Sequence, residues 1–146
     1  MIIGLGHYSR TGKDVTANLI CGFAARNGYA SRRMSFADPL KAVCHSIFGR
    51  YGLQDRAYYE QYPAARDIPL PMLNNKTPVE IWVEFGTPCV RERFNTNTWR
   101  DMLLEEASFV PQFIVPVADL RFPNEAQGIR ESGGKLVLVK RAGVEP

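Results

Sequence analysis

Residues 1–14 read Met1-Ile-Ile-Gly-Leu-Gly-His-Tyr-Ser-Arg-Thr-Gly-Lys-Asp14. The apolar run at positions 2, 3 and 5 is typical of a strand that is buried on both faces of a parallel sheet. A polar loop that contains glycine follows over 6–12. From Lys13 onward the pattern is helical, because apolar residues recur every three or four positions, at Val15, Leu19, Ile20 and Phe23. The stretch therefore predicts a strand, a glycine loop and a helix in direct succession.

This succession of elements is suited to binding an anion. The backbone N–H groups of such a loop and of the first helical turn point at one spot, where they form a cradle for a nucleotide phosphate. Lys13 would add a mobile charge over the β- and γ-phosphates. In the P-loop spacing G-x-x-x-x-G-K-[ST], Gly12 and Lys13 match, His7 replaces the first glycine, and Asp14 replaces the Ser or Thr. We predict a P-loop, and the alternative is a glycine-rich turn of another α/β domain.

The composition is that of one ordinary globular domain. The chain has 146 residues, of which 45% are hydrophobic and 23% charged. A net charge of +3 suits an anionic small substrate, and the basic run expected of a nucleic-acid-binding protein is absent from the sequence. The three cysteines are scattered without CxxC spacing, which favours free thiols over disulfides or a zinc site. Because Met1 leads directly into the first strand, we expect no signal peptide, no membrane span and a cytoplasmic location.

The remaining pattern alternates strands and helices. Further strands are predicted at 32–36, 112–119 and 135–140, and Pro116 indicates a bulge or an edge position in the second of these. Helices are predicted at 12–26, 38–48, 55–62, 78–85, 89–94, 99–108 and 121–132. The helix at 78–85 should bury Ile81, Trp82 and Phe85 and end at Gly86. This alternation predicts an α/β fold with a mostly parallel sheet covered on both faces.

Acidic residues follow two of the predicted strands. Asp119 ends a buried strand, where a carboxylate can hold Mg²⁺ beside the first helix, and Asp38 follows the strand at 32–36. Helix capping is the structural alternative for both. Phosphoryl transfer also needs cations, and the candidates are Lys13, Lys41, Arg66, Arg91, Arg93, Arg100, Arg121 and Arg130. Among these arginines, Arg121 and then Arg91 are the best placed.

Three stretches together resemble the phage-type deoxynucleoside monophosphate kinases of the P-loop kinase group. They are 6–14, 85–92 followed by Trp99, and 117–125 followed by Gly133-Gly134. The Arg-Thr-Gly-Lys-Asp form of the loop is typical of that family, and Asp-Leu-Arg-Phe-Pro-Asn-Glu at 119–125 is the most specific segment. The resemblance extends from Ile2 to about Arg141.

The resemblance implies a three-layer, P-loop kinase-like fold in a single domain over 1–146. The sheet would have the strand order second, third, first, fourth, and a helical insertion at about 50–110 would cover the acceptor site. The implied enzyme is an ATP-dependent phosphotransferase of deoxynucleotide metabolism. It would move the γ-phosphoryl group of ATP, with Mg²⁺, to the phosphate of a (deoxy)nucleoside monophosphate. Its partners would be small-molecule nucleotides and neither nucleic acid nor membrane; a homodimer is allowed, and a phage protein would lie in the host cytoplasm.

The resemblance also implies residue roles. The cofactor would be held by Ser9, Arg10, Thr11, Gly12, Lys13, Asp14 and Val15. The metal would be held by Asp14 and Asp119. The acceptor nucleotide would be bound by Asp38, Lys41, Arg66, Arg91 and Trp99. The catalytic cations would be Lys13, Arg91 and Arg121.

Two alternatives remain open on the sequence. Animal phosphomevalonate kinases are similar in their Gly-Lys-Asp loop, in a Pro-Leu-Lys segment (here 39–41) and in an Asp-x-Arg strand end (here 119–121). The resembled family normally continues past the last strand with a further strand and helix, whereas this sequence ends at Pro146. A shortened nucleotide-binding module without catalysis is therefore the second alternative.

Overall fold

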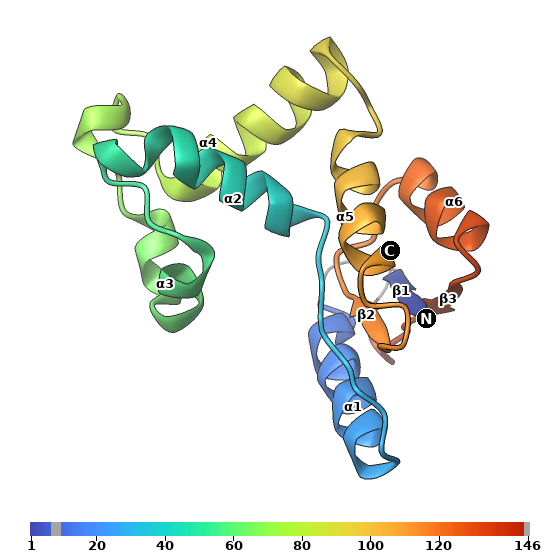
Figure 1. Cartoon of the computed structure of the whole chain (residues 1–146). Coiled ribbons are helices and arrows are strands. Elements are labelled where there is room, and N and C mark those ends of the chain that lie inside the picture. Colours follow the sequence, from blue (N-terminus) through green and yellow to red (C-terminus); the bar gives the residue numbers. More distant parts are fainter. Residues whose placement is uncertain (7–9, 145–146) are drawn as a thin grey trace. The chain divides into compact units, whose positions relative to one another are not determined.

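The computed structural model describes residues 1–6 and 10–144 (Figure 1). The chain forms two compact units. The first, which we call the sheet unit, comprises Met1–Phe36 and Arg100–Pro146. The second, the helical unit, comprises Ala37–Trp99. His7 and Ser9, which the sequence analysis placed in the phosphate loop, lie outside the described residues.

The sheet unit is built on three parallel strands. They are β1 (Ile2–Gly6), β2 (Val115–Val117) and β3 (Lys135–Leu138), in the order β2-β1-β3. Ile3 is paired with Pro116 of β2 and with Lys135 of β3, so β1 is the central strand. The α/β class and the parallel sheet are confirmed.

The strand expected at 32–36 does not form, and Pro116 explains why. This segment makes two isolated parallel bridges to the region of β2, Ser31 with Ile114 and Met34 with Val117. Arg32 N–H donates to Ile114 O at 3.0 Å and Met34 N–H donates to Pro116 O at 3.2 Å. The ladder bond between these two would need an N–H on residue 116, which proline lacks. The fourth strand of the expected order is therefore reduced to two bridges, and the expected edge position of Pro116 in the sheet is confirmed.

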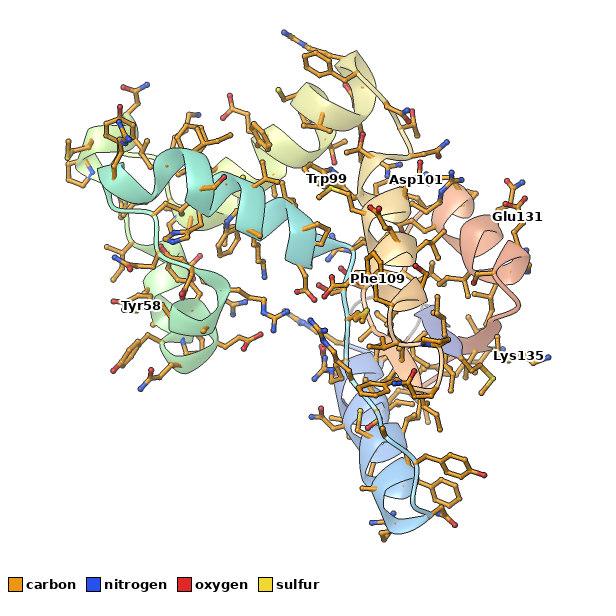
Figure 2. All side chains as sticks on the ribbon, viewed as in Figure 1. Tyr58, Trp99, Asp101, Phe109, Glu131 and Lys135 are labelled. Carbon is orange, nitrogen blue, oxygen red and sulfur yellow. The ribbon has the colours of Figure 1, made fainter. Side chains whose placement is uncertain are left out.

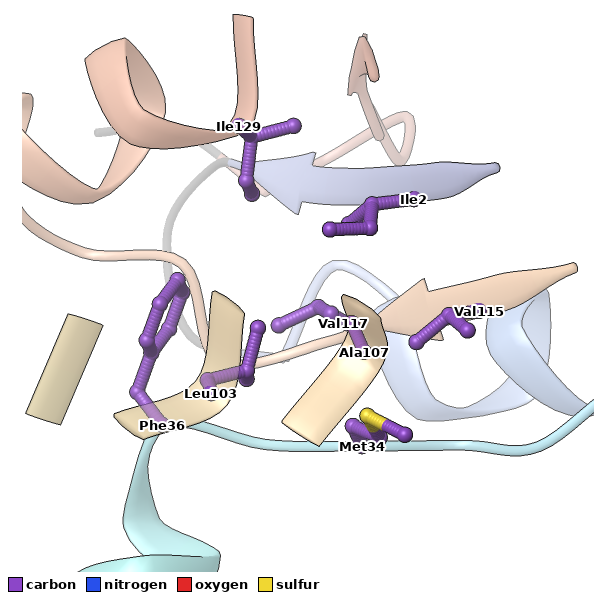
Figure 3. Close-up of a cluster of buried hydrophobic side chains, with 8 residues drawn as sticks. All are labelled: Ile2, Met34, Phe36, Leu103, Ala107, Val115, Val117 and Ile129. Atoms are coloured by element: carbon purple, nitrogen blue, oxygen red, sulfur yellow. The ribbon is translucent and has the colours of Figure 1, made fainter. Parts of the chain in front are cut away.

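Helices cover both faces of the sheet (Figure 1). On one face lies α1 (Lys13–Arg26), whose Ala17 packs with Leu5 of β1. On the other face lie α5 (Thr98–Ser108) and α6 (Pro123–Glu131). Figure 3 shows this second core, which contains Ile2, Met34, Phe36, Leu103, Ala107, Val115, Val117 and Ile129. Strands β1 and β2 thus bury both faces, as their apolar runs predict. Strand β3 is largely exposed instead, since Val137 is 43% and Leu138 60% exposed.

Helix α1 packs on the sheet unit through two alanines and the half-buried Ile20. Val15, Leu19 and Phe23 are 62–63% exposed, whereas Ala17 and Ala24 are buried. Three of the large apolar residues that indicate the helical period are therefore exposed. Alanines at positions i and i+7 lie on one face of a helix, and their small side chains let the helix approach the strands closely.

The helical unit has its own core. It contains α2 (Ala37–Phe48), α3 (Arg56–Gln61) and α4 (Pro78–Glu84), with 3₁₀ turns at Gly49–Tyr51, Pro63–Asp67 and Pro71–Leu73. Its buried cluster is Cys44, Leu53, Tyr59, Ile81 and Trp82, with Phe85 packed against it. The predicted buried side of the helix at 78–85 is therefore confirmed.

The predicted end of that helix at Gly86 is wrong, as is the separate turn at 89–94. Helix α4 continues into a π-helical segment, Phe85–Arg91. A Cβ atom on Gly86 would lie 2.8 Å from Leu40 Cδ2. Glycine at this position therefore allows close packing on α2 and does not mark a helix end.

Two features agree with the composition. The three cysteines are free thiols, as the sequence predicts. In the part of the chain that the structure describes, none of the helices combines the length and the apolar character needed to cross a membrane.

Candidate functional site

The loop before α1 has a backbone suited to anions. Arg10 has φ +65° and Gly12 has φ +96°, so both lie in the left-handed region. Any side chain at position 12 would be strained, because L-residues rarely adopt this φ. The N–H and the hydroxyl of Thr16 both donate to Gly12 O, at 2.9 and 3.0 Å. These bonds fix the first turn of α1, whose N-terminal N–H groups point toward the loop.

A pocket of the sheet unit lies where its three parallel strands end. Six cationic side chains line it: Arg10, Lys13, Arg33, Arg121, Lys140 and Arg141. Two carboxylates, Asp14 and Asp119, line it as well. Parallel strands carry their binding crevice at this edge. The excess of cations creates a positive potential that attracts a polyanion.

The pocket brings together residues from separate parts of the sequence. Five of them had been selected from the sequence: Arg10, Lys13, Asp14, Asp119 and Arg121. Sequence reasoning missed Arg33, Lys140 and Arg141. Lys140 ends the strand predicted at 135–140 and Arg141 follows it directly, so the strand-end rule that selected Asp119 could have found them.

Asp119 has a structural contact in addition to its place in the pocket. Its Oδ1 accepts a hydrogen bond from Phe36 N–H at 3.0 Å. This bond ties the 31–36 segment to the end of β2. Asp119 is half-buried and lines the pocket, and this bond restrains its carboxylate there.

Asp14 lies in the first turn of α1 and faces Arg33. Its side chain is 82% exposed, and Asp14 Oδ1 lies 2.6 Å from Arg33 Nη2. Within residues 1–6 and 10–144, no group of three or more His, Cys, Asp and Glu side chains could hold a metal ion by itself. Mg²⁺ typically binds through one or two carboxylates, waters and substrate phosphates. Asp14 and Asp119 therefore fit an ion that arrives with a polyphosphate.

The turn that carries Arg121 is held by a buried acid. Glu125 is 3% exposed, and its Oε2 accepts from the N–H groups of Arg121 and Phe122, at 2.9 and 3.0 Å. Helix α6 begins directly after this turn, at Pro123. The backbone of Arg121 is thus fixed while its exposed side chain lines the pocket. Sequence reasoning missed this role of Glu125. A Glu three residues after the N-cap residue, here Phe122, is a known sequence signal of a helix N-terminus.

The predicted acceptor-binding residues belong to the helical unit. Asp38 lies in the first turn of α2 and pairs with Arg56, with Asp38 Oδ2 2.8 Å from Nη1. Lys41, one turn later, places Nζ 4.7 Å from the ring centroid of Trp82, a cation–π contact. Arg66 is exposed, and its Nε donates to Pro63 O at 3.1 Å.

Arg91 and Trp99 are connected through the π-helical segment. Arg91 ends that segment and is 8% exposed. Trp99 is 5% exposed, and its indole N–H donates to Gly86 O at 3.0 Å (Figure 2). Trp99 thus supports the segment that carries Arg91. Irregular helical turns of this kind recur at functional sites.

The other loop residues differ in accessibility. Thr11 is 4% exposed and Val15 is 63% exposed, and neither lines the pocket of the sheet unit. Gly12 shapes the loop before α1 through its positive φ.

A comparison with curated proteins finds one informative relative. It is a protein of Acanthamoeba polyphaga mimivirus named "Putative deoxynucleotide monophosphate kinase". The two are 28% identical over an alignment of 159 positions, which covers 99% of this chain and 76% of the mimivirus protein. A scan against models of known protein families finds no match. The chain is therefore similar to that mimivirus protein across both the sheet unit and the helical unit.

Proposed function

We propose that the chain is a (deoxy)nucleoside monophosphate kinase with a P-loop kinase-like fold. It would transfer the γ-phosphoryl group of ATP to the phosphate of the acceptor nucleotide. The observation that carries this proposal is the pocket of six cations and two carboxylates at the N-terminus of α1. The similarity to the mimivirus protein supports a nucleotide kinase. The bridges of the 31–34 segment to the region of β2 support the order second, third, first, fourth.

Catalysis in this proposal rests on positioning and charge. The loop at 10–12 and the first turn of α1 bind the β-phosphate, and Lys13 reaches the β- and γ-phosphates. Asp14 and Asp119 would hold Mg²⁺, which, when bound, neutralises charge on the phosphate oxygens. Arg121 would stabilise the transferred phosphoryl group. Transfer is direct and in line, without a covalent intermediate on the protein.

The helical unit would bind the acceptor. It carries Asp38, Lys41, Arg66, Arg91 and Trp99. In the sequence it is inserted between the two parts of the sheet unit, which supports an acceptor-binding insertion, although it spans 37–99 and the expected insertion spans about 50–110. Arg91 and Lys41 would meet the acceptor phosphate, since both are cations on ordered helical segments.

The test is an assay of ADP release with ATP and Mg²⁺. The acceptors are a panel of deoxynucleoside and nucleoside monophosphates, with phosphomevalonate as a further arm. ADP release with a monophosphate supports the proposal. Release with phosphomevalonate alone would assign the chain to that reaction instead. Binding of ATP without release on any acceptor would indicate a nucleotide-binding module.

Replacing Lys13 tests the mechanism within this assay. Lys13→Ala should lower kcat by roughly 10²-fold or more, the usual cost of removing a cation that stabilises the transferring group. Lys135→Ala is the matched control, because Lys135 is an exposed lysine of β3 that does not line the pocket (Figure 2). A thermal melt of each variant reports the fold. A near-normal rate in Lys13→Ala would end this mechanism.

A further inference from the structure

Arg33 is a pocket cation that the proposed mechanism does not use. Its segment is fixed against the region of β2 on both sides, by the hydrogen bonds of Arg32 N–H and Met34 N–H. Its guanidinium binds two residues of α1 at once: Nη2 lies 2.6 Å from Asp14 Oδ1, and Nη1 donates to Asn18 Oδ1 at 2.8 Å. Asp14 and Asn18 are one helical turn apart. Arg33 therefore clamps the first turns of α1 beside the phosphate loop.

The clamp occupies a carboxylate oxygen that the proposed function gives to Mg²⁺. A divalent ion on Asp14 would draw charge away from both carboxylate oxygens and would repel the neighbouring guanidinium. The side chains of Arg33 and Asp14 are 40% and 82% exposed, so water screens their attraction and the pair is weak. A divalent ion that arrives with a polyphosphate can therefore displace the guanidinium.

The displaced guanidinium would remain in a pocket made for phosphate. Five other cations line the same pocket, so phosphate oxygens become its best available partners. Its planar fork can bind two such oxygens, which an ammonium group does less well. The backbone of Arg33 does not need to move, because its neighbours stay bonded to Ile114 and Pro116.

We propose that Arg33 exchanges partners when a metal-bound polyphosphate enters the pocket. It leaves Asp14, which turns to the metal ion, and binds a phosphate oxygen. This inference rests on the proposed function, because it takes Mg²⁺ and a polyphosphate as the ligands. The exchange makes Arg33 a phosphate-binding residue only in the presence of the metal ion.

The test is a binding titration with and without Mg²⁺. Inorganic tripolyphosphate and a non-hydrolysable ATP analogue are titrated calorimetrically into the protein, in excess Mg²⁺ and in EDTA. Arg33→Met should weaken binding about tenfold or more in Mg²⁺, the usual loss for a hydrogen bond to a charged group. In EDTA the loss should stay below about threefold, because Arg33 then remains on Asp14.

Arg32→Met is the matched control. Arg32 belongs to the same segment and has a comparable ion pair, with Nη2 2.6 Å from Glu106 Oε1, but it does not line the pocket. It should leave both titrations unchanged. Equal losses for Arg33→Met in Mg²⁺ and in EDTA, or no loss in either, would overturn the exchange.

A second variant keeps the test decisive if Arg33→Met does not fold. Asp14→Asn removes the competing negative charge from an exposed position, so Arg33 is held more weakly without metal, although it keeps its bond to Asn18. Tripolyphosphate should then bind more tightly in EDTA than it binds to the wild type, and the difference between Mg²⁺ and EDTA should shrink. An unchanged affinity in EDTA would refute the exchange.

The outcome can be separated from that of the kinase proposal. Tripolyphosphate carries no nucleoside, so a metal-dependent loss in Arg33→Met supports the exchange even if no monophosphate is phosphorylated. Conversely, phosphoryl transfer together with equal losses in both titrations leaves the kinase and removes the exchange.

Discussion

Removing the carboxylate of Glu125 should destabilise the sheet unit and disturb Arg121. Glu125 is 3% exposed and accepts two backbone N–H bonds, at 2.9 and 3.0 Å. A hydrogen bond to a charged group contributes about 1.5 to 3 kcal/mol. We take the lower end for each, since these N–H groups can reach water when the acid is absent. Glu125→Ala should therefore lower the free energy of unfolding by about 3 kcal/mol.

A substitution that keeps an acceptor should cost less. In Glu125→Gln a neutral carbonyl oxygen can take both N–H groups, so the loss should be about 1 kcal/mol. For a chain of this size, 3 kcal/mol corresponds to a fall in Tm of roughly 6 to 12 °C. Urea titrations followed by circular dichroism measure the free energies, and the binding of tripolyphosphate in Mg²⁺ reports the displacement of Arg121.

The control is an acid at the other end of the same helix. Glu131 is exposed and its Oε1 accepts from Gln127 Nε2 at 2.7 Å (Figure 2). An exposed pair at i, i+4 contributes a few tenths of a kcal/mol, so Glu131→Ala should be close to the wild type. If Glu125→Ala costs no more than Glu131→Ala, the turn that carries Arg121 is not held by this carboxylate.

Two further predictions concern the helical unit. Burial raises the pKa of the Cys44 thiol to about 12. Ellman's reagent should therefore modify Cys21 and Cys89 in the native protein and Cys44 only after unfolding. Equal rates of modification at all three thiols would contradict this prediction. The hydrogen bond from Thr77 N–H lowers the pKa of the Glu80 carboxyl below its ordinary value of 4.5. The stability that this hydrogen bond contributes is therefore present above pH 4.5 and is lost as the pH falls through the lowered pKa. Urea titrations at falling pH should therefore show a smaller acid-induced loss in Glu80→Gln than in the wild type, and parallel losses would count against the capping role.

The first strand, its loop and its helix could be predicted from the sequence, but the packed face of the helix could not. Val15, Leu19 and Phe23 repeat every four residues, and Ala17 and Ala24 lie seven residues apart. Both sets follow the helical period. Hydrophobicity favours the first set, whereas the structure buries the second set and half-buries Ile20 beside it. The choice depends on the distance between two elements, which no local pattern contains.

The segment at 31–36 shows a second limit. The sequence marks Pro116 as unusual within its own strand, but the consequence falls on the neighbouring segment, which loses one ladder bond. Which segment is the neighbour depends on the sheet order. A prediction made strand by strand cannot assign the defect to residues more than eighty positions away.

Some residues of the candidate site could be predicted from the sequence and others could not. Asp119 and Arg121 could be predicted, because they directly follow an apolar strand and the edge of a parallel sheet gathers such residues. Arg33 could not, because its place in the pocket depends on the two bridges that hold its segment. Glu125 is intermediate, since its position in the first turn of α6 is visible in the sequence but its burial is not.

The two carboxylates would make the pocket distinguish a metal-bound polyphosphate from a metal-free one. Cations alone would attract any polyanion, with or without a metal ion. Asp14 and Asp119 would repel a free polyphosphate and attract one that carries Mg²⁺, because carboxylates are ligands that this ion accepts. Arg33 strengthens this difference in the proposed exchange, because it neutralises Asp14 until the metal ion replaces it. Discrimination between the metal-bound and the free nucleotide would therefore come from the acids and from the arginine that faces one of them, and not from the number of cations.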